Sequence, residues 1–97
     1  MKLNSKIVCV DGFTMSVQAS ETSYCEPRVT GADSYIAAEV GFPSQEEELL
    51  AEYAEDPQNP CQTVYGWVPR QVIINVIAKH GGMVEGDLPA GFPILRG

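Results

Sequence analysis

The sequence predicts a single α+β domain, in which a mainly antiparallel sheet carries two helices on one face. A hairpin pattern covers residues 7–19, and apolar residues recur at i, i+1, i+4 and i+5 in residues 45–55 and 69–80. Each apolar helix face needs a sheet or another helix to cover it. The length of 97 residues, 44% of them hydrophobic and 20% charged, suits one globular domain. We expect this domain to span residues 1–85, followed by a Pro/Gly-rich irregular tail over 86–97.

The hairpin is indicated by two short apolar segments and the turn between them. Residues 7–10 form an apolar run, and Asp11 and Gly12 follow it as a two-residue turn signal because both tolerate positive φ. Residues 13–19 then alternate apolar and polar side chains with a period of two, which predicts a half-buried strand. Its apolar face consists of Phe13, Met15, Val17 and Ala19.

Two further strands are expected, over residues 35–40 and 63–68, after a surface loop at 20–34. Ala37 and Ala38 weaken the first strand, because alanine is a poor strand former. In the second strand, Gly66 indicates a bulge or a close backbone approach. The alternation places Tyr65 and Trp67 on the same side of that strand, either in the core or as an exposed recognition patch.

Residues 44–56 predict an acidic helix. Ser44 is a suitable N-cap, and Glu47 three residues later completes a capping box. The carboxylates in the first turn are favoured by the positive end of the helix dipole. The apolar face is formed by 49, 50, 53 and 54, and Pro57 ends the helix.

A second helix is predicted over residues 69–80. Pro69 suits its first position, and Gly81 with Gly82 supplies the C-terminal cap. Lys79 and His80 lie in the last turn, where the helix dipole favours a positive charge. The expected core of the whole domain comprises Val8, Val10, Met15, Val17, Leu50, Val72, Ile73, Val76 and Ile77.

The net charge of -7 comes almost entirely from the acidic helix. Six of the 13 acidic residues lie within 44–56, which leaves seven acids against six bases in the rest of the chain. A row of carboxylates can imitate a nucleic-acid backbone and attract a basic protein groove, or it can simply keep a helix face solvated. The candidate partner-binding residues are Glu46, Glu47, Glu48, Glu52, Glu55 and Asp56, with Tyr53 and Trp67 as anchors.

Several other functions have no support in the sequence. The acidic balance argues against direct binding to DNA, RNA or anionic membranes, and no apolar run is long enough to cross a bilayer. Phosphate-binding, hydrolase and calcium-loop motifs are absent, so we expect no cofactor, metal or catalytic residue. His80 has no local nucleophile or carboxylate beside it. Without a signal-peptide pattern the chain is expected to be cytoplasmic, with Cys9, Cys25 and Cys61 reduced.

Three short segments carry a resemblance: Glu39–Ser44 (EVGFPS), Val64–Pro69 (VYGWVP) and Lys79–Gly82 (KHGG). They resemble small proteins encoded by bacteriophages and prophages. The resemblance implies a protein made in the host cytoplasm during infection, of the kind that includes anti-CRISPR inhibitors acting by stoichiometric binding to a basic host protein or nucleoprotein complex. Two other hypotheses stay open, a phage structural or assembly accessory protein that self-associates, for instance as a homodimer, and a small-ligand binder or enzyme.

Overall fold

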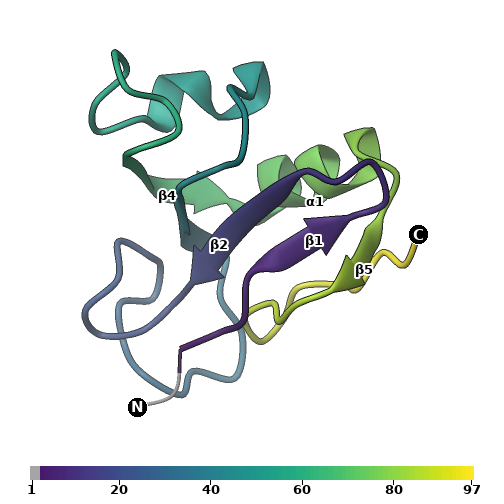
Figure 1. The fold of residues 1–97 in the computed structure, drawn as a ribbon. Helices are drawn as coiled ribbons and strands as arrows, with labels where there is room; N and C mark the ends of the chain where they lie inside the picture. Colours follow the sequence, from purple (N-terminus) through teal and green to yellow (C-terminus); the bar gives the residue numbers. More distant parts are fainter. Residues whose placement is uncertain (1–2) are drawn as a thin grey trace.

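The computed structural model describes residues 3–97 and confirms the α+β class. A five-stranded antiparallel sheet has the strand order β4-β3-β2-β1-β5, and two helical segments accompany it (Figure 1). The predicted order of hairpin, strand, acidic helical segment, strand and helix is therefore correct, and β5 is an addition. The elements are β1 (Ile7–Cys9), β2 (Thr14–Gln18), β3 (Ala37–Gly41), the 3-10 helix η1 (Glu48–Tyr53), β4 (Val64–Pro69), α1 (Arg70–Lys79) and β5 (Met83–Glu85).

A single apolar core lies between the sheet and the two helical segments. α1 passes behind β1 and β2 in Figure 1, and it buries Ile73, Val76 and Ile77. η1 lies next to β4, and its Leu50 is buried in the same core. Both helical segments thus pack against one face of the sheet, as the two apolar patterns predict.

The buried face of β1 is the opposite of the one predicted. Ile7 pairs directly with Met15 across the antiparallel ladder, and directly paired residues point to the same face. Because Met15 is in the core, Ile7 and Cys9 are buried, and Val8 is only half-buried. Val10 is 55% exposed because it belongs to the turn, which spans residues 10–12 rather than two residues. The expectation that Val8 and Val10 are core residues is therefore wrong.

The acidic segment is shorter and more tightly wound than the predicted helix over 45–55. The expected capping box is absent, because the Ser44 hydroxyl accepts from the N–H of Thr14 in β2. The helical turn begins only after Glu47, and at its other end Ala54 is extended and pairs with Tyr65 of β4. Only six residues remain between these two extended ends, and they form a 3-10 helix.

The bulge expected at Gly66 is present and reverses the placement of Trp67. The register between β3 and β4 shifts between Ala38 and Val40, so the alternation of side chains in β4 is interrupted. Tyr65 is buried in the core, whereas Trp67 adopts a φ of 50° and is 51% exposed. Tyr65 and Trp67 therefore do not share one side of the strand.

The C-terminal segment 86–97 contacts the domain along β5. The N–H of Met83 donates to the carbonyl of Leu95, and the N–H of Gly97 donates to the carbonyl of Met83. A side chain on Gly82 would lie 2.6 Å from the backbone of Gly97, so this position needs glycine. Phe92 is buried in the core, whereas Ile94 is exposed. Across residues 3–97, no helix has the length and apolar character that crossing a membrane requires.

The core of α1 gives a direct stability test. Truncating Ile73 or Ile77 to Ala should lower the free energy of unfolding by about 2–5 kcal/mol, because each leaves a cavity in a fully buried site. Ile36→Ala is the matched control, since Ile36 is exposed, and it should change the same quantity by about 0.5 kcal/mol or less. Urea unfolding measures all three, and equal losses would contradict the assigned core.

Candidate functional site

Five of the six acids in the acidic segment face solvent. Glu46, Glu48 and Glu52 are exposed before and along η1, and Glu55 and Asp56 are exposed just after it. Lys79 is the only lysine or arginine within residues 3–97 that forms an ion pair with this segment. Its closer contact, at 3.0 Å, is with Glu47, and its contact with Glu48 is 3.8 Å. The exposed acids therefore keep most of their negative potential.

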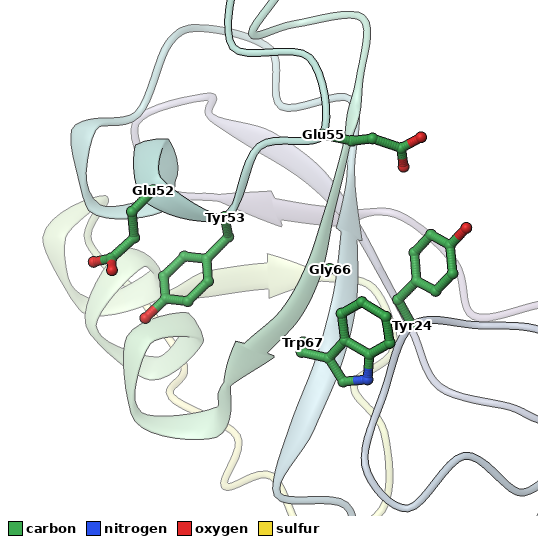
Figure 2. Close-up of a pocket in the computed structure, with 6 residues that line it drawn as sticks. All are labelled: Tyr24, Glu52, Tyr53, Glu55, Gly66 and Trp67. Atoms are coloured by element: carbon green, nitrogen blue, oxygen red, sulfur yellow. The ribbon is translucent and has the colours of Figure 1, made fainter.

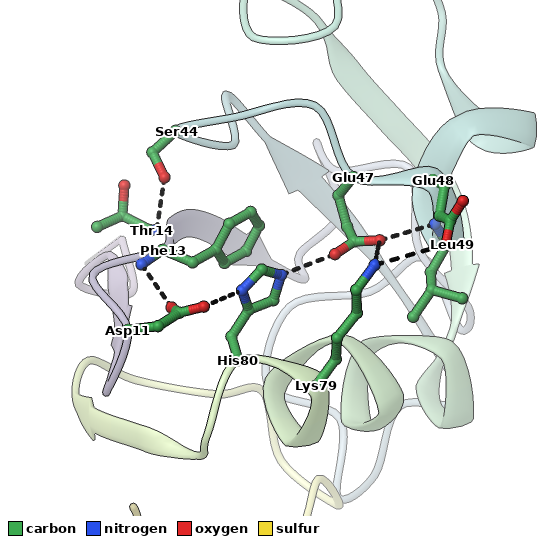
Figure 3. A network of polar contacts seen from close by, with 9 residues as sticks. All are labelled: Asp11, Phe13, Thr14, Ser44, Glu47, Glu48, Leu49, Lys79 and His80. Atoms are coloured by element: carbon green, nitrogen blue, oxygen red, sulfur yellow. Dashed lines mark hydrogen bonds and ion pairs between the residues drawn. The ribbon is translucent and has the colours of Figure 1, made fainter.

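Glu47 is the exception, because its side chain is only 1% exposed (Figure 3). One carboxylate oxygen, Oε2, accepts from the N–H of Leu49 at 2.8 Å and from Nζ of Lys79 at 3.0 Å. The other, Oε1, lies 2.7 Å from Nε2 of His80. The prediction that Glu47 is part of a partner-binding surface is wrong, since this carboxylate is already surrounded by donors from its own chain.

His80 is held between two carboxylates that come from distant parts of the sequence. Its Nδ1 lies 2.6 Å from Oδ2 of Asp11, while Nε2 contacts Glu47. The imidazole stacks on Phe13 with ring centroids 4.1 Å apart, and the side chain is only 4% exposed. Both ring nitrogens are therefore engaged by carboxylates, and the imidazole itself is shielded from solvent.

The charges in this network shift one another's pKa values. Burial alone would lower the pKa of His80, but the hydrogen bonds and charges of Asp11 and Glu47 raise it above the usual 6.5. Burial opposes ionisation of Glu47 too, but the Leu49 N–H, His80 and Lys79 together lower its pKa below 4.5. The pKa of Asp11 is lowered, first by the Phe13 N–H and then by His80. The network therefore favours a charged histidine between two charged carboxylates.

The hollow beside the acidic segment is lined by aromatic side chains. A pocket of about 450 Å³ lies between η1 and β4, lined by Tyr24, Glu52, Tyr53, Glu55, Gly66 and Trp67. Figure 2 shows Tyr53 and Trp67 on either side of Gly66, where β4 carries no side chain. The structure thus brings together four of the predicted partner-binding residues, Glu52, Tyr53, Glu55 and Trp67.

Trp67 is presented to solvent by an unfavourable backbone conformation. Its φ of 50° is in the left-handed region, which costs an L-amino acid about 1–2 kcal/mol. Phe42 has the same feature outside the pocket. The backbone N–H of Trp67 donates to the backbone carbonyl of Tyr24, and the two rings stack with centroids 4.9 Å apart. These contacts hold the indole in place at the rim of the pocket.

Tyr24 is the pocket residue that the sequence did not reveal. It lies in the loop 20–34 and packs closely over Gly66 of β4, where a Cβ would lie 3.3 Å from the Tyr24 Cβ, a tighter contact than usual. The guanidinium of Arg28 lies 5.3 Å from the centre of the Tyr24 ring. The Gly66 bulge signal predicted a close backbone approach, although nothing in the sequence identified Tyr24 as the residue that makes it.

The remaining candidate groups do not form a reactive or metal-binding centre in the described part of the chain. Cys9, Cys25 and Cys61 are unpaired, with the first two buried. Burial, and then the charge of Asp11, raises the pKa of the Cys9 thiol, which makes it a poor nucleophile. Residues 3–97 contain no group of three or more His, Cys, Asp or Glu residues placed to hold a metal ion.

Comparison of the chain with protein-family models, with curated proteins and with solved structures found no match.

The buried position of Glu47 predicts a large effect of its removal. Glu47→Ala should lower the free energy of unfolding by about 3–5 kcal/mol, because it leaves His80 without one of its two carboxylate partners inside the protein. Glu48→Ala is the control, and it should cost less than about 1 kcal/mol because that residue is exposed. Chemical denaturation compares them, and losses of similar size would show that the network contributes no more than a surface ion pair.

The same network predicts how stability depends on pH. The raised pKa of His80 gives stability that is complete below its unfolded value of about 6.5 and is lost as the pH rises through the folded value. The lowered pKa values of Asp11 and Glu47 give stability that is present above about 4.5 and is lost as the pH falls through their folded values. The melting temperature should therefore be highest at about pH 5–6.5.

Circular-dichroism melts between about pH 3 and pH 8 test this dependence, with His80→Gln as the comparison. This variant should lose the decline of melting temperature above about pH 6.5, because glutamine does not titrate. A wild-type melting temperature that rises from pH 6 to pH 8 would contradict the assigned charge state.

Proposed function

We propose that this protein is a non-enzymatic inhibitor that binds a basic, nucleic-acid-handling protein through its acidic surface. This acidic surface comprises Glu46, Glu48, Glu52, Glu55 and Asp56, together with the adjoining aromatic pocket. The observation that carries the proposal is the concentration of exposed carboxylates directly beside the exposed Trp67 and the half-buried Tyr24 and Tyr53. Charge steers a partner toward the surface, and buried aromatic contacts supply most of the affinity of an interface.

The distribution of charge supports a protein partner rather than a nucleic acid. The chain carries 13 acidic residues against six Lys and Arg. Exposed carboxylates along η1 and the turn after it can occupy the sites where a basic groove binds phosphates. A partner that handles nucleic acid presents such a groove, so the proposed inhibition is competition with the nucleic acid.

The specific version of this function is an anti-defence role of the anti-CRISPR type, in the cytoplasm of a host cell. It rests on the resemblance of Glu39–Ser44, Val64–Pro69 and Lys79–Gly82 to phage and prophage proteins. The carboxylates would imitate the phosphates of a guide or target strand.

Self-association as a phage structural or assembly protein is the second candidate. Exposed apolar side chains at β5 and the C-terminal segment favour it, namely Val84, Ile94 and Leu95. β5 is the last strand of the sheet, but at Met83 its outer edge is already paired with the C-terminal segment, so self-association would use these apolar side chains rather than strand pairing at that position. Sedimentation at increasing protein concentration separates a homodimer from a monomeric inhibitor.

Charge reversal tests the acidic surface directly. The triple variant Glu46→Lys, Glu52→Lys and Glu55→Lys should lose capture of basic nucleic-acid-binding proteins from a bacterial lysate. Glu48 is left intact because its carboxylate lies 3.8 Å from Lys79. The melting temperature should stay within a few degrees of wild type, since exposed charges contribute little to stability.

The matched control reverses three exposed acids elsewhere, Glu21, Asp33 and Glu85, which gives the same net charge. This control should still capture the partner. Capture by the wild type should weaken as salt rises and when duplex DNA or RNA is added as a competitor. Equal losses in both triple variants would mean that only the overall charge matters, and the proposed surface would be wrong.

A further inference from the structure

We infer that the pocket between η1 and β4 binds the guanidinium group of an arginine side chain on the partner protein. This inference rests on the proposed function, because it names the chemical group that the acidic surface and the pocket recognise together. The pocket offers two kinds of wall that suit a guanidinium, namely flat aromatic faces and carboxylates.

The aromatic walls favour a flat cation. Tyr53 and Trp67 stand on either side of Gly66, and Tyr24 stacks against Trp67 with an angle of 28° between the rings (Figure 2). Since Tyr24 and Trp67 face each other, they do not form the three-sided cage that encloses a methylated ammonium group. An open site with a flat indole face is better matched to a planar guanidinium, which stacks on aromatic rings and is weakly hydrated.

The carboxylates give the pocket its charge preference. Glu52 and Glu55 line it, and both residues are exposed. Neither forms an ion pair with a base within residues 3–97, where the ion pairs of the acidic segment involve Glu47 and Glu48. A guanidinium carries several N–H donors on different edges, so it can contact carboxylates while its face lies on a ring.

The protein already contains one example of this recognition. The guanidinium of Arg28 lies over the ring of Tyr24, 5.3 Å from its centre, next to Trp67. This contact shows that the ring of Tyr24 accommodates an arginine of its own chain. The pocket offers the same chemistry to a second arginine, with Trp67, Tyr53 and two carboxylates in addition.

The only tryptophan of the chain lies in this pocket, so its fluorescence reports binding directly. The probe is a short peptide with blocked ends and a single arginine, compared with the same peptide carrying lysine or citrulline. The arginine peptide should change the fluorescence saturably with a Kd on the order of 1 mM, as expected for one side chain. The lysine peptide should bind at least about 3-fold more weakly. Citrulline is flat but uncharged, so its peptide should give no saturable change.

Pocket variants separate this inference from the proposed function. Glu52→Gln with Glu55→Gln should weaken the arginine peptide about 10-fold, since the charged partners are lost. Glu46→Gln with Glu48→Gln, two exposed acids that do not line the pocket, should weaken it less than about 2-fold. Tyr53→Leu should abolish the response, with its melting curve as the check that the variant is folded.

Several outcomes would overturn the arginine assignment. Equal responses to the arginine and citrulline peptides, or equal losses in the two glutamine pairs, would do so. Tighter binding of free arginine than of the end-blocked peptide would point to a small-molecule site, because the free amino acid differs from the peptide by its α-ammonium and carboxylate groups, which such a site would recognise. In a further outcome, the Tyr53→Leu variant captures a protein partner as well as the wild type does, while charge reversal of Glu46, Glu52 and Glu55 abolishes capture. That pair of results would exclude the pocket from the interface and leave the acidic surface as the binding site.

Discussion

The contact between the Glu47 carboxylate and the His80 imidazole is the interaction on which the arrangement of the domain depends. It joins the entry of η1 to the end of α1, and Asp11 extends the same network to the turn between β1 and β2. A buried ion pair is costly to remove from water, so it is favourable only when its hydrogen bonds are complete. Here they are, because the described chain has no buried side-chain nitrogen or oxygen without a hydrogen-bond partner.

This network also decides which acids of the acidic segment are available to a partner. Glu47 turns inward, accepts from the Leu49 N–H and thereby begins η1. The residues on either side of it stay exposed, as do the acids along and after η1. One inward carboxylate therefore positions the segment, and the outward carboxylates give it its electrostatic field. The two roles are separable, since the first acts on folding and the second on association.

The pocket is formed by two departures from regular structure. The bulge in β4 turns Trp67 outward, and the short η1 with the extended residue Ala54 places Tyr53 opposite it. A regular strand would have put Trp67 on the same side as Tyr65, and η1 ends beside β4 because Ala54 pairs there with Tyr65. Backbone conformations of this cost persist where surrounding contacts hold them, and they are concentrated at functional sites. The stacking of Tyr24 on Trp67 supplies such a contact.

By itself the sequence determined the fold class, the order of the main elements, the position of α1 and the concentration of negative charge. These follow from local periodicity, the glycines that end α1 and composition, which act over a few neighbouring residues. The tertiary structure alone decided the buried face of β1, the inward position of Glu47, the outward position of Trp67 and the place of Tyr24 in the pocket. Each of these depends on pairing between residues far apart in the chain. No local pattern encodes the register of Ile7 with Met15, or the contact between Glu47 and His80, whose residue numbers differ by 33.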